Sequence, residues 1–338
     1  MKSTYRAMQI SKPGVLELVT KTVPTPGEGE VLIQVEACGI CGADIFDIDV
    51  VSPDVYPPRV PGHEVVGNII ARGKGVSSRW PIGKRVGIGR LGGPCNDCEY
   101  CRQGKFQYCS NQPTIGSTVD GGYAEVMIAR ASGLVSIPDD LKSINAAPML
   151  CAGIATFNAL KKCSAQAGDT VAICGIGGLG HLAIQYARHM GYRVVAVGRG
   201  EDIRTTVTQL GAHHYIDTND DSLASFIQAH GHFDAAIMTI NNSKLTAEIT
   251  KALAPNGQLV LLGVGPESLA INSGVLVGKE KSIVGSITGM PFENEKALQF
   301  SVLTNVNPMI ETLPLEQANE AYQRMKSGKV NYRMVLTI

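Results

Sequence analysis

Four cysteines with the spacing of metal ligands lie in one short segment of the chain. They are Cys95, Cys98, Cys101 and Cys109. Four thiolates at this spacing are typical of a closed tetrahedral zinc site, which leaves no coordination position for a substrate. An iron–sulfur cluster and a free-thiol redox loop are the alternatives. We expect a structural zinc ion that holds the surrounding lobe together, so that chelation of the metal loosens the lobe.

A second set of metal-ligand residue types is dispersed along the first half of the chain. Its members are Cys41, His63, Glu64 and Cys151. Each of them, taken alone, is more simply explained as part of the protein core. Two cysteines and one histidine are nevertheless the ligands of an open catalytic zinc site, whose fourth position takes water or a substrate oxygen. Sequence spacing alone does not bring these residues together.

A glycine-rich turn is the third feature that could support chemistry. A short apolar run is followed by Gly-x-Gly-x-x-Gly and then by a helical pattern. In such a unit the glycines let the backbone approach a diphosphate, and the helix N-terminus offers unpaired N–H groups. The motif also occurs in ordinary turns, so its context must decide. The residues expected to contact the cofactor are Gly175, Gly177, Gly178, Leu179 and Gly180.

The residues after the next expected strand bear on the choice of nicotinamide cofactor. NAD enzymes usually carry a carboxylate about 20 residues after the glycines, where it accepts a hydrogen bond from the ribose 2′-hydroxyl. That position is Gly198 here, and Arg199 and Arg204 follow it. Both arginines could bind a 2′-phosphate, which favours NADP(H) over NAD(H). Glu201 could supply the carboxylate after a small loop shift, so NAD(H) is the alternative.

The pattern of apolar segments changes near residue 152. Residues 1–151 are β-rich and punctuated by Pro and Gly turns, whereas short apolar strands alternate with helical stretches from 152 to 287. This alternation predicts an α/β domain with a doubly wound parallel sheet. The six expected strands are 171–174, 193–197, 214–216, 235–238, 259–262 and 282–285, with helices such as 203–210 and 244–253 between them.

The last segment, 288–338, is too short to fold alone. It contains an expected helix at 315–327 and a final strand at 334–338. We therefore expect it to return to the domain formed by residues 1–151.

Composition and charge argue against several classes of protein. The chain has 338 residues, a formal net charge of zero and no basic stripe, which argues against nucleic-acid binding. The N-terminus lacks a secretory h-region, and no run approaches about 18 apolar residues, which argues against a membrane span and for the cytoplasm. Nine cysteines in such a chain favour metal sites or free thiols over disulfides. Cys38, Cys163 and Cys174 match no motif and are expected in the core.

Several motifs follow one another along the chain in a recognisable order. They are Gly39–Asp44, Pro61–Gly67, the four-cysteine segment, Asp120–Glu125, Cys151–Gly153 and Gly175–His181. With these motifs, nearly the whole chain resembles the zinc-dependent medium-chain alcohol dehydrogenases. The resemblance implies a GroES-like catalytic domain in two sequence pieces, with a Rossmann domain between them.

The resemblance also assigns roles to single residues. It implies that Cys41, His63 and Cys151 bind a catalytic zinc, and that the adjacent Glu64 can bind it transiently when water moves. Asp44 would be the carboxylate that orients the His63 ring, as carboxylates commonly do at metal-bound histidines.

Four positions add to this assignment or depart from the family pattern. Arg333 matches a basic residue that in relatives reaches the cofactor phosphates or the surroundings of the zinc. Ala43 replaces a Ser or Thr that passes the alcohol proton towards solvent, and Phe46 stands where some relatives have a relay histidine. Arg90 replaces an aromatic residue of the substrate pocket. It would favour a polar or anionic substrate, or else point to solvent.

The expected function is therefore hydride transfer between a nicotinamide cofactor and a small alcohol, aldehyde or ketone. The resemblance implies two zinc ions per chain, one catalytic and one structural, and a homodimer or homotetramer. A polyol or sugar dehydrogenase of the same family is one alternative, which Arg90 alone supports. A catalytically inactive, zinc-stabilised binding protein is another, against which the intact ligand set argues.

Overall fold

The computed structural model describes residues 3–50 and 58–338, which form two compact units. Unit 1 comprises Met1–Ile154 and Gly289–Ile338, and unit 2 comprises Ala155–Thr288. The pattern of apolar segments in the sequence predicts domain boundaries at 151/152 and 287/288. The tertiary contacts place the boundaries of the two units at 154/155 and 288/289. Unit 1 is thus assembled from two separate pieces of sequence.

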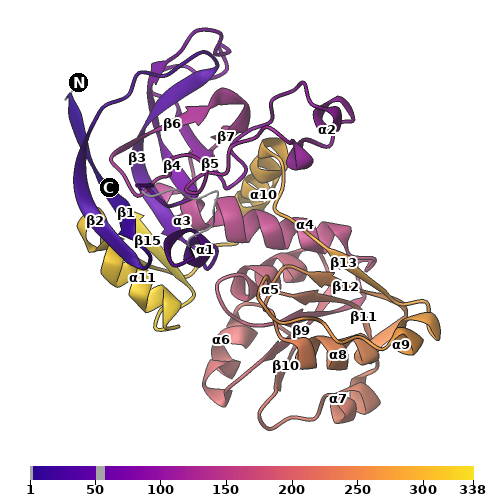
Figure 1. Ribbon diagram of the computed structural model, residues 1–338. Helices are drawn as coiled ribbons and strands as arrows, with labels where there is room; N and C mark the ends of the chain where they lie inside the picture. The colour runs from indigo at the N-terminus through magenta and orange to yellow at the C-terminus, as the bar shows by residue number, and fades with distance from the viewer. Residues whose placement is uncertain (1–2, 51–57) are drawn as a thin grey trace. The chain divides into compact units, whose positions relative to one another are not determined.

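Unit 1 is built mainly from antiparallel strands. In Figure 1 its N-terminal piece is mostly indigo and purple, and its C-terminal piece is yellow. One sheet pairs β1 (Thr4–Lys12) with β2 (Val15–Thr22). The other has the order β14-β15-β3-β4-β5-β7, and β6 also pairs with β3. The bounds of its strands are β3 Glu30–Ile40, β4 Glu64–Arg72, β5 Arg85–Ile88, β6 Val126–Arg130, β7 Val135–Ser136, β14 Ile310–Pro314 and β15 Arg333–Thr337.

The C-terminal segment completes the larger sheet of unit 1. β15 pairs antiparallel with β3, with Leu336 opposite Cys38. Through this pairing, the segment Gly289–Ile338 is part of unit 1. The helices of unit 1 are short, apart from α10: α1 Asp44–Ile48, α2 Glu99–Arg102, α3 Ser143–Pro148, α10 Pro291–Thr304 and α11 Ala318–Lys326.

Unit 2 contains the predicted parallel sheet of six strands. Its order is β10-β9-β8-β11-β12-β13, so the chain starts in the middle and winds outwards in both directions. All pairings are parallel, and the four residues Val194–Val197 are buried, as expected of a strand covered on both faces. The strands are β8 Thr170–Cys174, β9 Arg193–Gly198, β10 His214–Asp217, β11 Phe233–Met238, β12 Leu253–Leu261 and β13 Ser282–Gly285. The Rossmann architecture expected from the sequence is confirmed.

Helices lie between successive strands of unit 2 (Figure 1). Their starts are encoded locally in several cases. Asn242, for example, accepts a hydrogen bond from the backbone N–H of Leu245 and so caps the first turn of α8. The helices are α4 Ile154–Lys162, α5 Gly180–His189, α6 Arg204–Gln209, α7 Leu223–His230, α8 Ser243–Ala252 and α9 Ser273–Val277.

One strand of unit 2 starts earlier than the sequence predicts. β12 begins at Leu253, whereas its apolar pattern begins at Leu259. The segment Pro255-Asn256-Gly257 has the composition of a turn, and Asn256 has a positive φ of 60°. The strand accommodates this segment as an irregularity, because the pairing with β11 shifts register between Phe233 and Ala235.

One continuous helical stretch in the described part of the chain, Ser143–Lys162, is long and apolar enough to cross a membrane by length and composition. It includes α3, a π-helical turn at Met149–Gly153 and α4. Its most apolar window is 83% buried inside the protein, as in a core helix.

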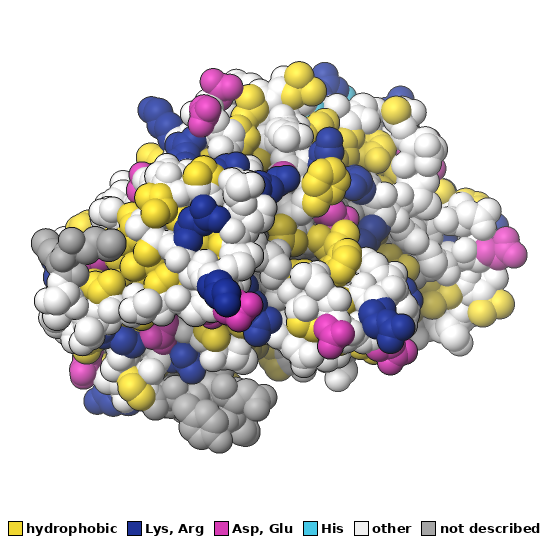
Figure 2. Space-filling view, turned by 90° about the horizontal axis from the view of Figure 1, so that it is seen from above, with side chains coloured by type: hydrophobic (Ala, Val, Ile, Leu, Met, Phe, Trp, Pro, Cys, Tyr) yellow, Lys and Arg dark blue, Asp and Glu magenta, His cyan; other side chains and the backbone are white. Residues whose placement is uncertain are grey.

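On the face seen in Figure 2, basic, acidic and apolar side chains are interspersed.

Candidate functional site

Two neighbouring strands deliver most of the dispersed ligand residues to one place. β3 ends at Ile40, directly before Cys41, and β4 begins at Glu64, directly after His63. The strands are antiparallel, with Gly39 opposite Glu64, so the end of β3 lies beside the start of β4. Gly39 permits this approach because a Cβ there would lie 1.9 Å from Glu64 Oε2.

Cys151 comes from a third element, the π-helical turn Met149–Gly153. Its Sγ lies 3.8 Å from the Sγ of Cys41. The ligand atoms of Cys41, His63, Glu64 and Cys151 all lie within 4.8 Å of one another. The structure thus brings together the residues that sequence spacing could not join.

The donor atoms of this cluster fit a zinc ion. His63 is fully buried, and its Nε2 has no hydrogen-bond partner among the described residues. A buried ring nitrogen without a partner is unfavourable unless a ligand takes its lone pair. Two thiolates and an imidazole are a donor set that zinc accepts readily, and three protein ligands leave one position open.

The ionisable groups of the cluster perturb one another strongly. The hydrogen bond between the two sulfurs lowers the pKa of Cys41 and raises the pKa of Cys151. Burial lowers the pKa of His63, but Asp44 and Cys41 outweigh burial and raise that pKa to about 10. The cluster therefore favours a thiolate next to a positive charge, and a metal cation would supply that charge in place of the imidazole proton.

Asp44 holds the ring of His63 in one orientation. Its Oδ1 lies 3.0 Å from His63 Nδ1, and both side chains are fully buried. Its Oδ2 accepts hydrogen bonds from the Cys41 N–H at 2.8 Å and from the Tyr123 hydroxyl at 3.0 Å. Because Nδ1 faces Asp44, Nε2 is left for a metal. Sequence reasoning did not single out Tyr123, although its motif, Asp120–Glu125, was the available signal.

We expect Tyr123→Phe to weaken metal retention while the chain stays folded. The change removes only the hydroxyl that supports Asp44, and loss of such indirect support typically costs about 10- to 100-fold in metal affinity. Zinc release into a chromogenic chelator measures the effect. Tyr192→Phe is a matched control, because that hydroxyl donates to the Leu160 carbonyl in unit 2. Equal release rates for both variants would contradict the support role of Tyr123.

Glu64 is tied to Arg333 at the far side of the cluster. Arg333 Nη2 donates to both carboxylate oxygens of Glu64, and both side chains are buried. Burial raises the pKa of Glu64 to about 8, although Arg333 opposes the shift. The structure thus pairs the Arg333 guanidinium with a carboxylate of the ligand cluster. A contact between Arg333 and the cofactor phosphates stays a prediction.

Arg90 does not simply point to solvent, because its charge is paired inside the protein. It forms a bidentate ion pair with Asp47, with Nη2 2.9 Å from Oδ1 and Nη1 2.5 Å from Oδ2. Its Nη1 also lies 3.4 Å from His63 Nδ1. Nearby, Ala43 offers no side-chain donor or acceptor, and Phe46 is exposed.

The four-cysteine segment forms a second cluster of ligand atoms. The sulfurs of Cys95, Cys98, Cys101 and Cys109 lie within 4.8 Å of one another. Backbone N–H groups point at these sulfurs, with Cys98 N 3.3 Å from Cys95 Sγ and Cys95 N 3.3 Å from Cys109 Sγ. Such bonds favour thiolates, and backbone N–H groups of Asp97 and Cys98 lower the pKa of Cys95 to about 6. All nine cysteines are free of disulfides.

The glycine turn in unit 2 leaves an open cradle at one position. Gly175 has a φ of +92° and Gly180 packs so closely that a Cβ would lie 2.0 Å from the Gly175 carbonyl oxygen. A Cβ on Gly177, in contrast, would meet nothing within 4 Å. The N-terminus of α5 has no side-chain cap, and the buried His181 places Nδ1 3.1 Å from the Gly177 carbonyl oxygen. The turn therefore fits a diphosphate at Gly177.

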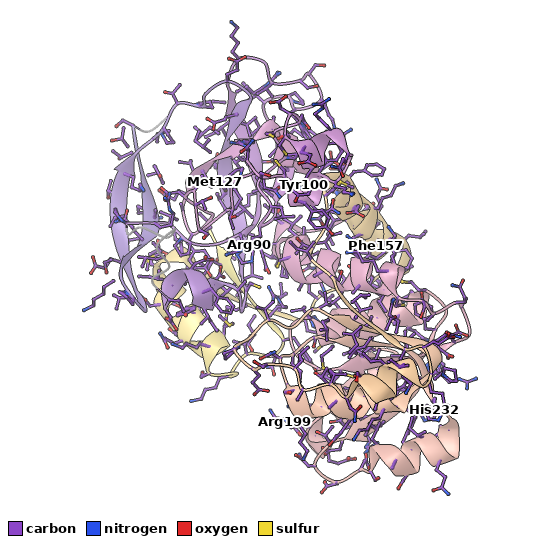
Figure 3. The ribbon with its side chains drawn as sticks, turned by 45° about the vertical axis from the view of Figure 1, so that its right-hand side comes forward. Arg90, Tyr100, Met127, Phe157, Arg199 and His232 are labelled. Carbon is purple, nitrogen blue, oxygen red and sulfur yellow. The ribbon has the colours of Figure 1, made fainter. Side chains whose placement is uncertain are left out.

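The segment after β9 has one arginine that is engaged and one that is exposed. Arg204 Nε donates to Glu201 at 2.6 Å, and its guanidinium stacks over the Tyr215 ring. Arg199 is exposed, at the margin of unit 2 (Figure 3). The buried Gly198 leaves little room for a side chain, because a Cβ there would lie 3.0 Å from Ile176.

Comparison with known proteins decides the family. Residues 27–139 match the alcohol dehydrogenase GroES-like domain, and residues 178–302 match the zinc-binding dehydrogenase domain. The chain is 39% identical over 313 residues to the alcohol dehydrogenase notN of Aspergillus sp. (strain MF297-2), which covers 93% of this chain and 91% of the relative. The chain belongs to the zinc-dependent medium-chain alcohol dehydrogenases.

Solved structures of other dehydrogenases share the fold of the whole chain. The acetophenone reductase from Geotrichum candidum, in complex with NAD, is 27% identical with a TM-score of 0.88, covering 100% of this chain and 98% of that one. The CAD from Helicobacter pylori, complexed with NADP(H), is 27% identical with a TM-score of 0.87, covering 100% and 99%. This alcohol dehydrogenase is an NAD(P)-dependent oxidoreductase of alcohols and carbonyl compounds.

Proposed function

We propose that this dehydrogenase holds two zinc ions per chain and uses NADP(H) in preference to NAD(H). The catalytic ion would be bound by Cys41, His63 and Cys151, and the structural ion by the four-cysteine segment. The observation that carries the proposal is that ligand atoms of Cys41, His63 and Cys151 lie within 4.8 Å of one another. In addition, the buried Nε2 of His63 has no hydrogen-bond partner among the described residues. When bound, zinc supplies Lewis-acid activation of the alcohol or carbonyl oxygen, and the nicotinamide exchanges the hydride.

The residues around the cluster have separate roles in this reaction. Asp44 Oδ1 lies 3.0 Å from His63 Nδ1, and this contact would keep the other ring nitrogen available to the metal. As thiolates, Cys41 and Cys151 would provide negative charge that offsets the charge of the ion. Arg333 holds Glu64 in a buried ion pair, and this pair would have to loosen before Glu64 could bind the metal.

The preference for NADP(H) rests on the segment after β9. No carboxylate occupies position 198, and the exposed Arg199 is available to an anionic group. Glu201, the residue that could serve NAD(H), is already bound by Arg204. An arginine pairs well with phosphate because its planar fork matches the phosphate oxygens.

A panel of alcohols, aldehydes and ketones, each run with NAD(H) and NADP(H), tests the reaction and the cofactor together. We expect Arg199→Leu to raise the KM for NADP(H) by about 10- to 100-fold. This factor corresponds to the loss of a charge-assisted contact with the 2′-phosphate, which contributes about 1.5–3 kcal/mol. The KM for NAD(H) should stay within about threefold of wild type. Arg193→Leu, at the opposite end of β9, is the matched control. An unchanged ratio of the two KM values would refute the proposed role of Arg199.

The missing relay hydroxyl gives a further prediction. We expect Ala43→Ser to raise the rate of alcohol oxidation near neutral pH by up to about tenfold. This is less than the full 10²–10⁴ of a positioned acid–base group, because Phe46 provides no second relay member. The pH–rate profile of kcat measures the effect, with Ala43→Gly as the control for the local change in packing. An identical profile for the serine variant would count against a missing relay.

We also propose a homodimer formed through the edge of the parallel sheet. β13 pairs only with β12 in the described sheet, so its other edge has free backbone groups. Val264 and Val277 are highly exposed in the same unit, at 80% and 78%. A two-fold pairing of β13 with its symmetry copy would cover such an edge. Light scattering at micromolar concentration tests the assembly, and a monomer would contradict it.

The alternative functions receive no separate support. The polyol dehydrogenase interpretation depended on Arg90, whose charge is already paired with Asp47. An inactive binding protein does not require the cluster at Cys41, His63 and Cys151. The substrate panel includes polyols for this reason.

A further inference from the structure

The ion pair between Asp47 and Arg90 has no role in the proposed reaction, yet it lies next to the proposed catalytic zinc site. Asp47 belongs to α1 and its side chain is 2% exposed, while Arg90 follows β5 and its side chain is 23% exposed. Figure 3 shows Arg90 within unit 1. The pair is bidentate, and Arg90 Nη1 lies 3.4 Å from His63 Nδ1.

Asp47 is also close to the carboxylate that orients His63. Asp44 and Asp47 are three residues apart on α1 and therefore lie on one face of the helix. One ligand atom each of Asp44, Asp47 and His63 lie within 4.8 Å of one another, and all three residues are buried. Two carboxylates thus lie near the imidazole of His63. Of the two, Asp44 is the one whose oxygen lies 3.0 Å from Nδ1.

Each member of the ion pair would disturb His63 if the other were missing. Without Arg90, the Asp47 carboxylate would be buried, unpaired and free to compete with Asp44 for the Nδ1 proton. Without Asp47, the Arg90 guanidinium would be free to bind Asp44, or would repel a metal-bound imidazole at 3.4 Å. The bidentate geometry keeps each group occupied by the other.

The backbone around Arg90 is held in place by hydrogen bonding, which fixes one end of the ion pair. The Arg90 carbonyl accepts a hydrogen bond from the Ile115 N–H at 3.0 Å. Helix α1 is only five residues long and has no side-chain cap at its N-terminus. Its orientation therefore depends on contacts such as the one between Asp47 and Arg90.

We propose that Asp47 and Arg90 are positioning residues that occupy each other so that Asp44 alone orients His63, and that they thereby set how tightly the catalytic zinc is retained. The inference rests on the proposed zinc site at Cys41, His63 and Cys151. The pair acts through His63, whose Nδ1 lies 3.4 Å from Arg90 Nη1.

Zinc release from the purified enzyme into a chromogenic chelator tests the inference. The structural zinc in the four-cysteine segment serves as an internal reference. We expect R90M and D47N each to release the catalytic zinc about 10- to 100-fold faster than wild type. The double variant R90M/D47N leaves neither charge unpaired, so its release should return to within about threefold of wild type.

Further variants separate this effect from a loss of folding. R90K keeps the charge beside Asp47 and should release zinc within about fivefold of wild type, which preserves the test if R90M fails to fold. Arg324→Met breaks the Arg324–Glu311 ion pair elsewhere in unit 1 and should leave release unchanged. In cobalt-substituted protein, R90M should shift the visible absorption of the catalytic site, and the double variant should restore it.

The outcomes distinguish this inference from the proposed function. Two zinc ions in wild type, with equal release from R90M and wild type, would overturn the inference alone. The inference alone would also be overturned if wild type held two zinc ions and the double variant released zinc faster than either single variant. The pair would then act only through packing. A single zinc in wild type would overturn both the proposed zinc site and the inference.

Discussion

Replacing Cys151 with alanine is expected to lower kcat/KM for alcohol oxidation by about 10⁴-fold. The change removes one of the three proposed ligands of the catalytic zinc, and the activation that a metal ion supplies is worth several kcal/mol, or about 5 kcal/mol for this factor. Steady-state kinetics with the substrate of the highest wild-type activity measure the loss. Thermal unfolding should change little, because the four-cysteine segment and the apolar packing within both units stay intact.

Cys163→Ala provides the matched control for this variant. Cys163 is a buried free thiol in unit 2 that belongs to neither ligand cluster. Its loss should affect packing while kcat/KM stays within a few-fold of wild type. A Cys151→Ala enzyme with nearly full activity would show that the cluster is not the site of reaction.

Two glycines of the same turn are expected to respond in opposite ways to alanine. A Cβ on Gly177 has open space in the protein, so Gly177→Ala should leave the melting temperature unchanged. It should weaken cofactor binding by about 10- to 100-fold, because the methyl group occupies the cradle of the diphosphate and at least one charge-assisted hydrogen bond of about 1.5–3 kcal/mol is lost.

Gly180→Ala should do the reverse. Its Cβ would lie 2.0 Å from the Gly175 carbonyl oxygen, so α5 must move away from the end of β8. Such overpacking typically costs about 1–3 kcal/mol of stability. Calorimetry of unfolding and fluorescence titration with NADPH measure the two effects. Equal losses of stability in both variants would contradict the separate roles of the two glycines.

Local features of the chain could be predicted from the sequence because their physics is local. The four cysteines lie close enough together that their spacing alone indicates one metal site. The strands of the Rossmann unit are continuous apolar runs, and their alternation with helices predicts a parallel sheet. The start of β12 could not be predicted, because Pro255-Asn256-Gly257 has the composition of a turn and only its pairing with β11 makes it part of a strand.

The surroundings of the candidate site depend on contacts between distant residues. Arg333 and Glu64 are 269 residues apart, and Arg90 and Asp47 are 43 apart. Nothing in the sequence near Arg90 indicates that it pairs with an acid on α1. The support of Asp44 by Tyr123, 79 residues away, is likewise a consequence of tertiary packing. The ligand set itself could be proposed only from the resemblance to a family.

The zinc content of the purified wild-type enzyme tests the central claim most directly. Elemental analysis should give two zinc ions per chain, and X-ray absorption should fit the average of one site with four sulfurs and one with two sulfurs and an imidazole nitrogen. Cys151→Ala should retain one zinc with four sulfurs. One zinc in wild type, or two in Cys151→Ala, would contradict a catalytic metal bound by Cys41, His63 and Cys151.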